Sequence, residues 1–399
     1  MKMRNIALLT AAVLATAMPV SAQETEQAAE TEMMTEVAAS DSDTEQQLSD
    51  KWSDFQIQID GTVYQFPMMY DDFVALGWSS DEVEGQELEP NQYGYYTFYR
   101  DDVECSVYLL NFGVNTEPAE KCIVGGLSID NYFWPVDTGD VVLPGGIEKG
   151  KSDVEAIKAA YGTPSDTYEG ELYTELTYET DIYSNLELTV YNESGVLEEI
   201  SLQNFTEPEG YETGEISDEI PDAVASYSKP DSLSDDLSAY QIELDGQVYE
   251  LPVPVCVLIS DGWELDESNS DSAIKAQYYG WVTLRKGGQQ IREIVVNQED
   301  YGTVPENCWL EGLEIGGYTL EADGSLPGGI REGMPEEEFL KILEDNNMTY
   351  ELDESDSFRY YTYNEKGYDQ CMEVTVYTDS DGTFEKDTVM TISCTNAFE

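Results

Sequence analysis

One pattern occurs twice in the chain, as Phe55-Gln-Ile-Gln-Ile-Asp-Gly-Thr-Val-Tyr-Gln-Phe-Pro67 and, without a gap, as Tyr240-Gln-Ile-Glu-Leu-Asp-Gly-Gln-Val-Tyr-Glu-Leu-Pro252. In both copies apolar residues alternate on either side of an Asp-Gly pair, which supplies the positive φ angles of a tight hairpin turn. The pattern therefore predicts one β-hairpin at Asp60-Gly61 and another at Asp245-Gly246.

The correspondence continues along the chain in the same order. Three further matches are Cys122 to Ile129 with Cys308 to Ile315, Leu143-Pro-Gly-Gly-Ile147 with Leu326-Pro-Gly-Gly-Ile330, and Leu188-Thr-Val-Tyr191 with Val374-Thr-Val-Tyr377. Self-similarity at a fixed spacing indicates repeated structural units. Each copy has the size of a small domain, so we expect two tandem modules.

The segments outside these copies differ from them in composition. Lys2 and Arg4 precede an apolar run at 6–20 and then Val20-Ser-Ala22, which is the pattern of a secretory signal. Residues 23–50 are mainly Glu, Thr, Ala and Ser, and residues 206–236 combine Pro, Gly and acids. The predicted parts are a signal peptide at 1–22, a disordered acidic arm at 23–50, module 1 at 51–205, an acidic linker at 206–236 and module 2 at 237–399.

Within a copy the patterns predict strands with short helices between them. Residues 71–76 before Gly77 predict a short helix, while 93–99 and 105–111 alternate as strands do. Ser152-Asp-Val-Glu155 predicts a capping box at the start of a second helix, and Pro335 is expected at the first position of its counterpart. The expected class is α+β, as two tandem copies of a mainly antiparallel β module with short helices.

The second half of each copy also resembles a known fold. The run Ile330-Arg-Glu-Gly-Met334 before a helix, followed by a β-meander, is similar to the β-lactamase inhibitor proteins and to the outer-membrane lipoprotein family called SmpA/OmlA. Here Pro335 replaces the Thr of those families, and the first copy, Ile147-Glu-Lys-Gly-Lys151, lacks the Met. The resemblance implies a binding surface on a sheet and carries no catalytic residues. The chain as a whole resembles secreted bacterial repeat proteins of unknown function.

Charge and composition exclude several classes of function. The chain has 83 Asp and Glu against 18 Lys and Arg, a net charge of -65, so phosphates would repel it and nucleic acid is excluded as a partner. His is absent, which removes Ser-His and Cys-His nucleophile pairs and most transition-metal sites. No cofactor, metal site or catalytic residue is predicted. The acidic turn Asp379-Ser-Asp-Gly382 is better explained as a hairpin turn than as a calcium loop.

Six cysteines in an exported chain predict three disulfides. Only Cys122 and Cys308 correspond between the copies, so each copy needs its own partner thiols. The expected pairs are Cys105 with Cys122, Cys256 with Cys308, and Cys371 with Cys394.

Tyrosine is the most abundant aromatic residue, with 28 copies, and it is concentrated in predicted strands. Alternation places Tyr95 and Tyr99 on one side of their strand and Tyr96 and Phe98 on the other, so one of the two sides is core. The candidate ligand-binding residues are Tyr95, Tyr99, Tyr279 and Trp281, because Tyr and Trp bury large areas at low entropic cost. Cross-strand packing with simple solvent exposure is the alternative.

Together these features predict a secreted, extracellular, non-catalytic protein that binds a protein or a glycan at the cell surface. No membrane insertion is expected after the signal is removed, because no second apolar run is long enough. The first alternative is an inhibitor of an extracellular enzyme. The second is a carbohydrate-binding or carbohydrate-active protein, since paired carboxylates serve glycosidases.

Overall fold

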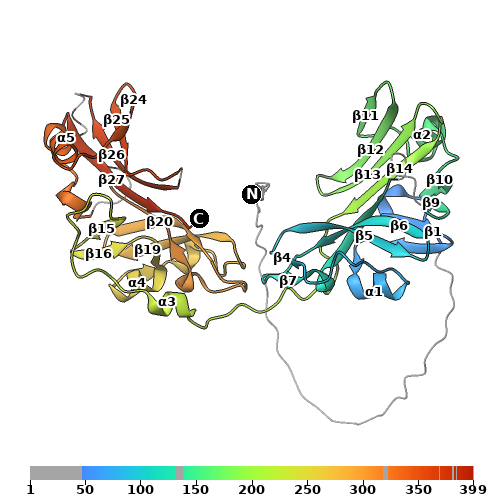
Figure 1. Cartoon of the computed structure of the whole chain (residues 1–399), viewed down its shortest axis with the longest axis horizontal. Coiled ribbons are helices and arrows are strands. Elements are labelled where there is room, and N and C mark those ends of the chain that lie inside the picture. The colour runs from blue at the N-terminus through green and yellow to red at the C-terminus, as the bar shows by residue number, and fades with distance from the viewer. Residues whose placement is uncertain are drawn as a thin grey trace, which may run out of the picture. The chain divides into compact units, whose positions relative to one another are not determined.

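The computed structural model describes residues 47–130, 138–317, 322–367, 369–379, 382 and 384–398. The predicted signal peptide, most of the predicted acidic arm and two residues of the acidic turn at 379–382 lie outside the described residues. Antiparallel strands dominate the described chain, and the helices are short (Figure 1). A mainly antiparallel β fold with few helices is therefore confirmed.

Both predicted hairpins are present. β1 (Gln56–Ile59) pairs with β2 (Thr62–Gln65), and β15 (Gln241–Leu244) pairs with β16 (Gln247–Glu250). The turn residues have the positive φ angles that such a turn requires, 49° and 82° at Asp60 and Gly61 and 50° and 77° at Asp245 and Gly246. A cis peptide bond follows each hairpin, at Phe66-Pro67 and Leu251-Pro252.

In the first half, residues 51–205, one sheet contains eight strands in the order β11-β12-β13-β14-β8-β6-β5, with β3 beside β8. A four-stranded sheet has the order β10-β9-β1-β2, and β4 pairs with β7. The strands not yet delimited are β3 (Met68–Met69), β4 (Glu87–Leu88), β5 (Tyr93–Arg100), β6 (Val103–Leu110), β7 (Glu117–Pro118), β8 (Ile123–Ile129), β9 (Val141–Leu143), β10 (Ile147–Glu148), β11 (Asp166–Glu169), β12 (Tyr173–Asp181), β13 (Ser184–Tyr191) and β14 (Leu197–Asn204).

In the second half, residues 237–399, the strands form a three-stranded sheet, β16-β15-β23, and two separate five-stranded sheets, β17-β21-β20-β19-β18 and β22-β27-β26-β25-β24. The remaining strands are β17 (Val253–Pro254), β18 (Glu264–Leu265), β19 (Tyr279–Lys286), β20 (Gln289–Val296), β21 (Trp309–Leu310), β22 (Gly312–Gly316), β23 (Gly324–Ser325), β24 (Tyr350–Glu354), β25 (Phe358–Tyr363), β26 (Gln370–Tyr377) and β27 (Thr388–Asn396).

The two halves differ at one strand. β8 runs unbroken between β6 and β14 in the first half, whereas the matching segment of the second half is divided into β21 and β22 at Glu311. The position that corresponds to Glu311 is Gly125, where a Cβ would lie 2.1 Å from Leu110 Cδ1. A side chain at this position would require Leu110 to move, so the glycine allows Leu110 of β6 to pack closely on β8.

Four of the helices lie near the predicted positions, whereas α3 (Asp222–Ser226) lies within residues 206–236, where only a linker was predicted. The other helices are α1 (Tyr70–Ala75), α2 (Val154–Tyr161), α4 (Val255–Ser260) and α5 (Glu336–Asp345). The predicted capping box is wrong by one residue: Asp153 caps α2 by accepting from the Ala156 N–H at 2.8 Å, whereas the Ser152 hydroxyl accepts from the Glu148 N–H. Pro335 is likewise the residue before α5.

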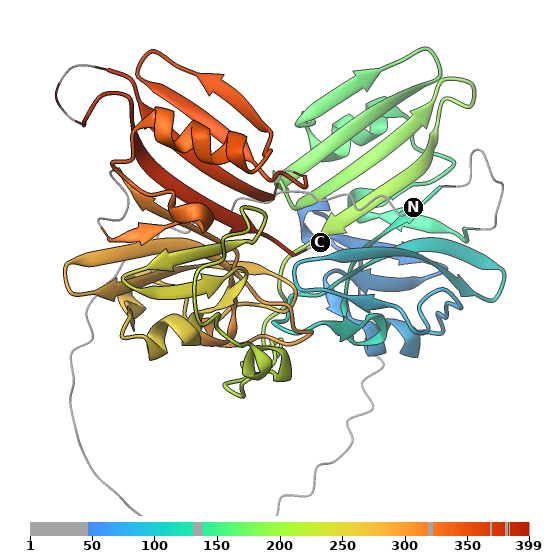
Figure 2. The ribbon, with the colours of Figure 1, turned by 60° about the vertical axis from the view of Figure 1, so that its left-hand side comes forward.

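Buried apolar side chains form two clusters, one drawn from residues 55–202 and the other from residues 237–394. In the second cluster Phe339 of α5 packs edge-on against Tyr361 of β25, with ring centroids 5.3 Å apart, and α5 lies against β24–β27 (Figure 2). An apolar helix stripe on an apolar sheet face is the usual way that such layers exclude water.

None of the three predicted disulfides is present: all six cysteines are free thiols. The strand register explains two of these errors. Cys371 pairs with Thr395 and Cys394 with Met372, so the two thiols point to opposite faces of the sheet. Leu110 of β6 pairs with Ile123, the residue next to Cys122, and Cys105 lies five residues before Leu110 in the same strand. Five residues span about 16 Å of a strand, which is too far for a disulfide.

The third predicted pair, Cys256 with Cys308, is absent as well, and the buried Cys308 thiol has a different contact. Cys308 Sγ donates to the Val304 carbonyl at 3.7 Å, as Cys122 Sγ does to the Pro118 carbonyl at 3.6 Å. Burial raises the pKa of both thiols to about 12. At neutral pH these thiols are therefore protonated and poorly nucleophilic.

Candidate binding face

Cross-strand pairing brings two rows of polar and aromatic side chains to one face of the eight-stranded sheet. One row is Tyr95, Tyr108, Gly126, Gln203, Asn185 and Glu179, and the next is Thr97, Ser106, Ser128, Ser201, Glu187 and Thr177. The residues between them in sequence, such as Val107, Leu127 and Leu202, are buried in the core. We call the two rows, with Tyr93, Tyr99, Glu175 and Glu199 beside them, the open sheet face.

The structure places all four candidate binding residues at the surface. Tyr95 and Tyr99 of β5 are 50% and 45% exposed, and Phe98 on the other side of the strand is completely buried. Tyr279 and Trp281 of β19 are 45% and 44% exposed. The alternation predicted for β5 is thus observed, while the binding role of these side chains stays a prediction.

Tyr95 belongs to a cluster of four aromatic rings on the open sheet face. Its ring centroid lies 4.8 Å from that of Tyr108, which is 6.2 Å from Tyr93 and 5.4 Å from Phe205. Phe205 in turn lies 5.5 Å from Tyr93, which is 60% exposed. Tilted and edge-on contacts at these distances are favourable, so the rings hold one another in place while part of their surface stays in water.

Three members of this cluster were not among the predicted binding residues. Tyr108 faces Tyr95 through the register of the hairpin between β5 and β6, a signal that the sequence already contained. Phe205 follows β14 and reaches Tyr108 only because β8 lies between β6 and β14. No local pattern could have predicted that contact.

Tyr99 is separate from the cluster. Its backbone N–H and carbonyl form a bridge with Ser79, at 2.8 and 2.9 Å. Glu82 also accepts from the Thr97 N–H at 2.7 Å, so the loop after α1 covers this end of the β5 edge.

The second half has different side chains at the matching positions. Trp281 corresponds to Tyr95, and the Arg292 guanidinium lies 5.5 Å above its ring. Tyr279 stacks on Tyr278 with centroids 4.8 Å apart and an interplanar angle of 14°. A guanidinium therefore covers one side of the Trp281 indole, whereas no cation of the described residues lies over the Tyr95 ring.

Carboxylates gather at the other end of the open sheet face. Burial raises the pKa of Glu199 to about 7, and the neighbouring Asp130 carboxyl adds to the effect, while the Tyr191 hydroxyl that donates to Oε1 at 2.6 Å opposes it. Burial, with Glu175 and Glu179 nearby, also raises the pKa of Glu187. Neither of the two rows contains Lys or Arg, although Lys149 interacts electrostatically with Glu199 and Asp130 at this end of the face.

Glu293 is a further carboxylate with a raised pKa, and it lies on β20 of the second half, near β22 of the neighbouring five-stranded sheet. Glu293 occupies the β20 position that corresponds to the buried Val107, and burial together with the Glu314 charge raises its pKa to about 7. Glu314 also raises the pKa of Glu373 in addition to the effect of burial. Placing an acid at a core position costs free energy unless it is protonated or paired.

These raised pKa values predict that the protein is more stable in mild acid than at pH 8. A carboxyl with a folded-state pKa near 7 and an ordinary value of 4.5 favours folding when protonated, and this contribution is lost as pH rises between those values. Glu293→Gln cannot ionise, so its urea midpoint is expected to fall less between pH 5 and pH 8 than that of the wild type.

The matched control is Glu264→Gln, at an exposed position on β18. This variant should keep the full pH dependence of the wild type. Equal slopes for wild type and Glu293→Gln would contradict the assignment of the titration to Glu293.

Among the described residues, no group of three or more Cys, Asp or Glu is placed to hold a metal ion, and no helix is both long and apolar enough to cross a membrane. Comparison of the chain with protein-family models, curated proteins and solved structures gave no match.

Proposed function

We propose that this chain is an exported, non-catalytic binding protein of two tandem modules, and that the open sheet face of the first module binds a basic protein. The resemblance of each second half to inhibitor-like folds supports a sheet face as the binding surface. The observation that carries the proposal is the exposed cluster of Tyr93, Tyr95, Tyr108 and Phe205 beside carboxylates on one continuous sheet.

The chemistry of this face favours a protein partner over a small molecule. Partly exposed tyrosines held by their neighbours lose little entropy on binding, and such side chains dominate the affinity of protein interfaces. The acidic end of the face adds attraction for a cationic surface, which raises the association rate at low ionic strength. A partner with Lys or Arg around an apolar centre complements both parts.

The test is affinity capture from the extracellular fraction of the producing organism, with the full chain from Gln23 onward as bait. We expect a stoichiometric basic protein to bind wild type and to bind Tyr95→Ala at least about tenfold more weakly, because truncation of a central aromatic residue typically costs more than 1 kcal/mol. Tyr350→Ala, at a 44% exposed position on β24, is the matched control and should bind as wild type does.

The same experiment separates the alternatives. If the captured protein is an enzyme whose activity falls on binding, the inhibitor interpretation is favoured. Saturable binding to polysaccharide that is lost with Tyr95→Ala or Trp281→Ala would replace the protein partner by a glycan. Capture that is equal for wild type and Tyr95→Ala would remove the open sheet face from the proposal.

A further inference from the structure

A groove of about 980 Å³ lies on the first half, away from the open sheet face. Residues 63–76, from β2 through α1, form one wall, and residues 208–214 form the other. The apolar part of its lining, which we call the floor, includes Met69 and Leu76, which are 43% and 39% exposed. The floor is apolar and open to water, although the chain as a whole is strongly polar. Such a surface can bury a ligand.

The charged part of the lining, which we call the rim, is mainly acidic. Asp72, Glu117, Glu209 and Glu212 line it, together with one cation, Lys121, whose ammonium lies 3.6 Å from the Glu117 carboxylate. A ligand for this site therefore has apolar groups for the floor and positive charge for the rim.

The second half shows how the matching surface is used, because residues 217–229 of the chain cover it. Ser217 forms a bridge with Thr303, and Asn307 Nδ2 donates to the Glu219 carbonyl at 2.9 Å. Val224 of α3 is 4% exposed, so its side chain is buried by this packing.

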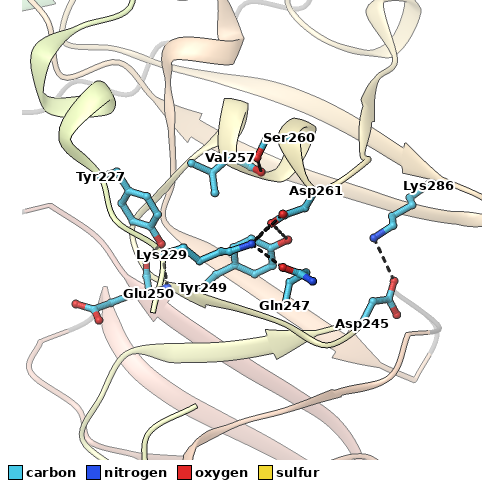
Figure 3. A network of polar contacts seen from close by, with 10 residues as sticks. All are labelled: Tyr227, Lys229, Asp245, Gln247, Tyr249, Glu250, Val257, Ser260, Asp261 and Lys286. Atoms are coloured by element: carbon cyan, nitrogen blue, oxygen red, sulfur yellow. Dashed lines mark hydrogen bonds and ion pairs between the residues drawn. The ribbon is translucent and has the colours of Figure 1, made fainter. Parts of the chain in front are cut away.

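The end of this covering segment is held by an aromatic ring and a cation (Figure 3). The Tyr227 hydroxyl donates to the Glu250 carbonyl at 3.0 Å, and its ring lies 6.2 Å from Trp309. Lys229 Nζ donates to both Asp261 carboxylate oxygens at 2.7 and 2.8 Å, and to Gln247 Oε1 at 2.6 Å. The covering segment is thus a peptide with a short helix, a buried Val, a Tyr and a terminal Lys.

The residues that hold this peptide correspond to residues that line the groove of the first half. By the register of the two copies, Thr303, Asn307, Glu250 and Asp261 correspond to Glu117, Lys121, Gln65 and Leu76. In the second half, Asp261 binds Lys229 of the covering segment. The first half has Leu76 at that position, and the carboxylates of its groove belong to the rim residues instead. The site accepts a peptide of the same shape with a different distribution of charge.

We propose that the groove between residues 63–76 and 208–214 binds a basic, apolar peptide segment of a partner protein, in the manner in which residues 217–229 cover the second half. The site is separate from the open sheet face and goes beyond the function proposed there. Lys121 and Gln65 supply polar side chains for the backbone of the peptide, Leu76 and Met69 contact its apolar side chains, and the rim carboxylates pair with its cations.

The test uses a fluorescein-labelled peptide with the sequence of residues 217–229 in which Asp218, Glu219 and Asp222 are replaced by lysine. Fluorescence anisotropy with the full chain from Gln23 onward, at low ionic strength, is expected to show saturable binding with one peptide per chain. The unaltered, acidic peptide should bind at least about tenfold more weakly because the rim repels it.

Leu76→Arg places a cation in the floor and is expected to weaken binding of the basic peptide by about tenfold or more. Ile182→Arg, at an 80% exposed apolar position outside the groove, is the matched control and should bind as wild type does. Tyr95→Ala should also leave peptide binding unchanged, which separates this site from the open sheet face. Thermal unfolding of each variant confirms that it folds.

Three kinds of outcome would overturn the proposal. One is a failure of the binding comparison, either equal binding of the basic and acidic peptides or binding that Leu76→Arg leaves unaffected. Another is concentration-dependent self-association that Leu76→Arg abolishes, which would make a second copy of the chain the occupant. The third is peptide binding that is seen only after residues 23–46 are deleted, which would identify the chain's own leading segment as the occupant.

Discussion

Replacing Arg359 by alanine is expected to lower the free energy of unfolding by about 3 kcal/mol, because it leaves a buried carboxylate without its counter-ion. Glu336, at the start of α5, is 8% exposed, and both of its oxygens contact Arg359 Nη1. The Tyr361 hydroxyl donates to the same carboxylate, and Arg359 Nη2 also reaches Asp387 Oδ1 at 2.8 Å. Urea denaturation of the full chain measures the loss.

Arg285→Ala is the control for this prediction. Arg285 Nε donates to Asp266 at 2.6 Å, but the arginine side chain is 50% exposed, so the expected loss is much smaller than for Arg359→Ala. The double variant Arg359→Ala/Glu336→Gln should recover part of the stability, since it removes the uncompensated charge. Similar losses for Arg359→Ala and Arg285→Ala would show that burial does not strengthen the Arg359 pair.

Gly125→Glu is expected to lower the free energy of unfolding by about 3 kcal/mol and to weaken partner capture. A Cβ at this position would lie 2.1 Å from Leu110 Cδ1 and 3.0 Å from Phe205 Cδ1. The new side chain must therefore displace the buried Leu110 side chain and move Phe205, which belongs to the aromatic cluster. Urea denaturation and affinity capture measure the two effects.

Gly288→Glu, in the turn between β19 and β20, is the matched control. No atom lies within 4 Å of a Cβ built at Gly288, and the expected change is within about 0.5 kcal/mol. If Gly125→Glu were as stable as Gly288→Glu, Leu110 and Phe205 would move aside without cost, and their close packing on Gly125 would have no energetic importance.

Short-range features of the fold were predictable because the residues that determine them are neighbours in sequence. The Asp60-Gly61 turn has the expected positive φ angles, and the buried Phe98 lies on the side of β5 opposite the exposed Tyr95. The start of α2 shows the limit of this reasoning. Ser152 and Asp153 are both good caps, and the Ser152 hydroxyl instead accepts from the Glu148 N–H, which leaves Asp153 to cap the helix.

Long-range features were not predictable, because they depend on which strands become neighbours. The predicted pair Cys371 and Cys394 lies on adjacent strands, yet a register offset of one residue turns the two thiols to opposite faces. The aromatic cluster depends in the same way on β8 lying between Tyr108 of β6 and the end of β14, where Phe205 follows. A single sequence contains no record of that order.

The segment of the second half that corresponds to β8 is divided into β21 and β22. This division changes how the strands of the two halves can separate. In the first half every step from β11 to β5 is a backbone ladder, so strands part only if ladder hydrogen bonds break. In the second half, within the described residues, β20 and β22 share no such ladder, and the acidic Glu293 and Glu314 lie at that point. Local opening of the first-half sheet therefore breaks ladder hydrogen bonds at every step, whereas the step from β20 to β22 in the second half is held by side chains of one shared core.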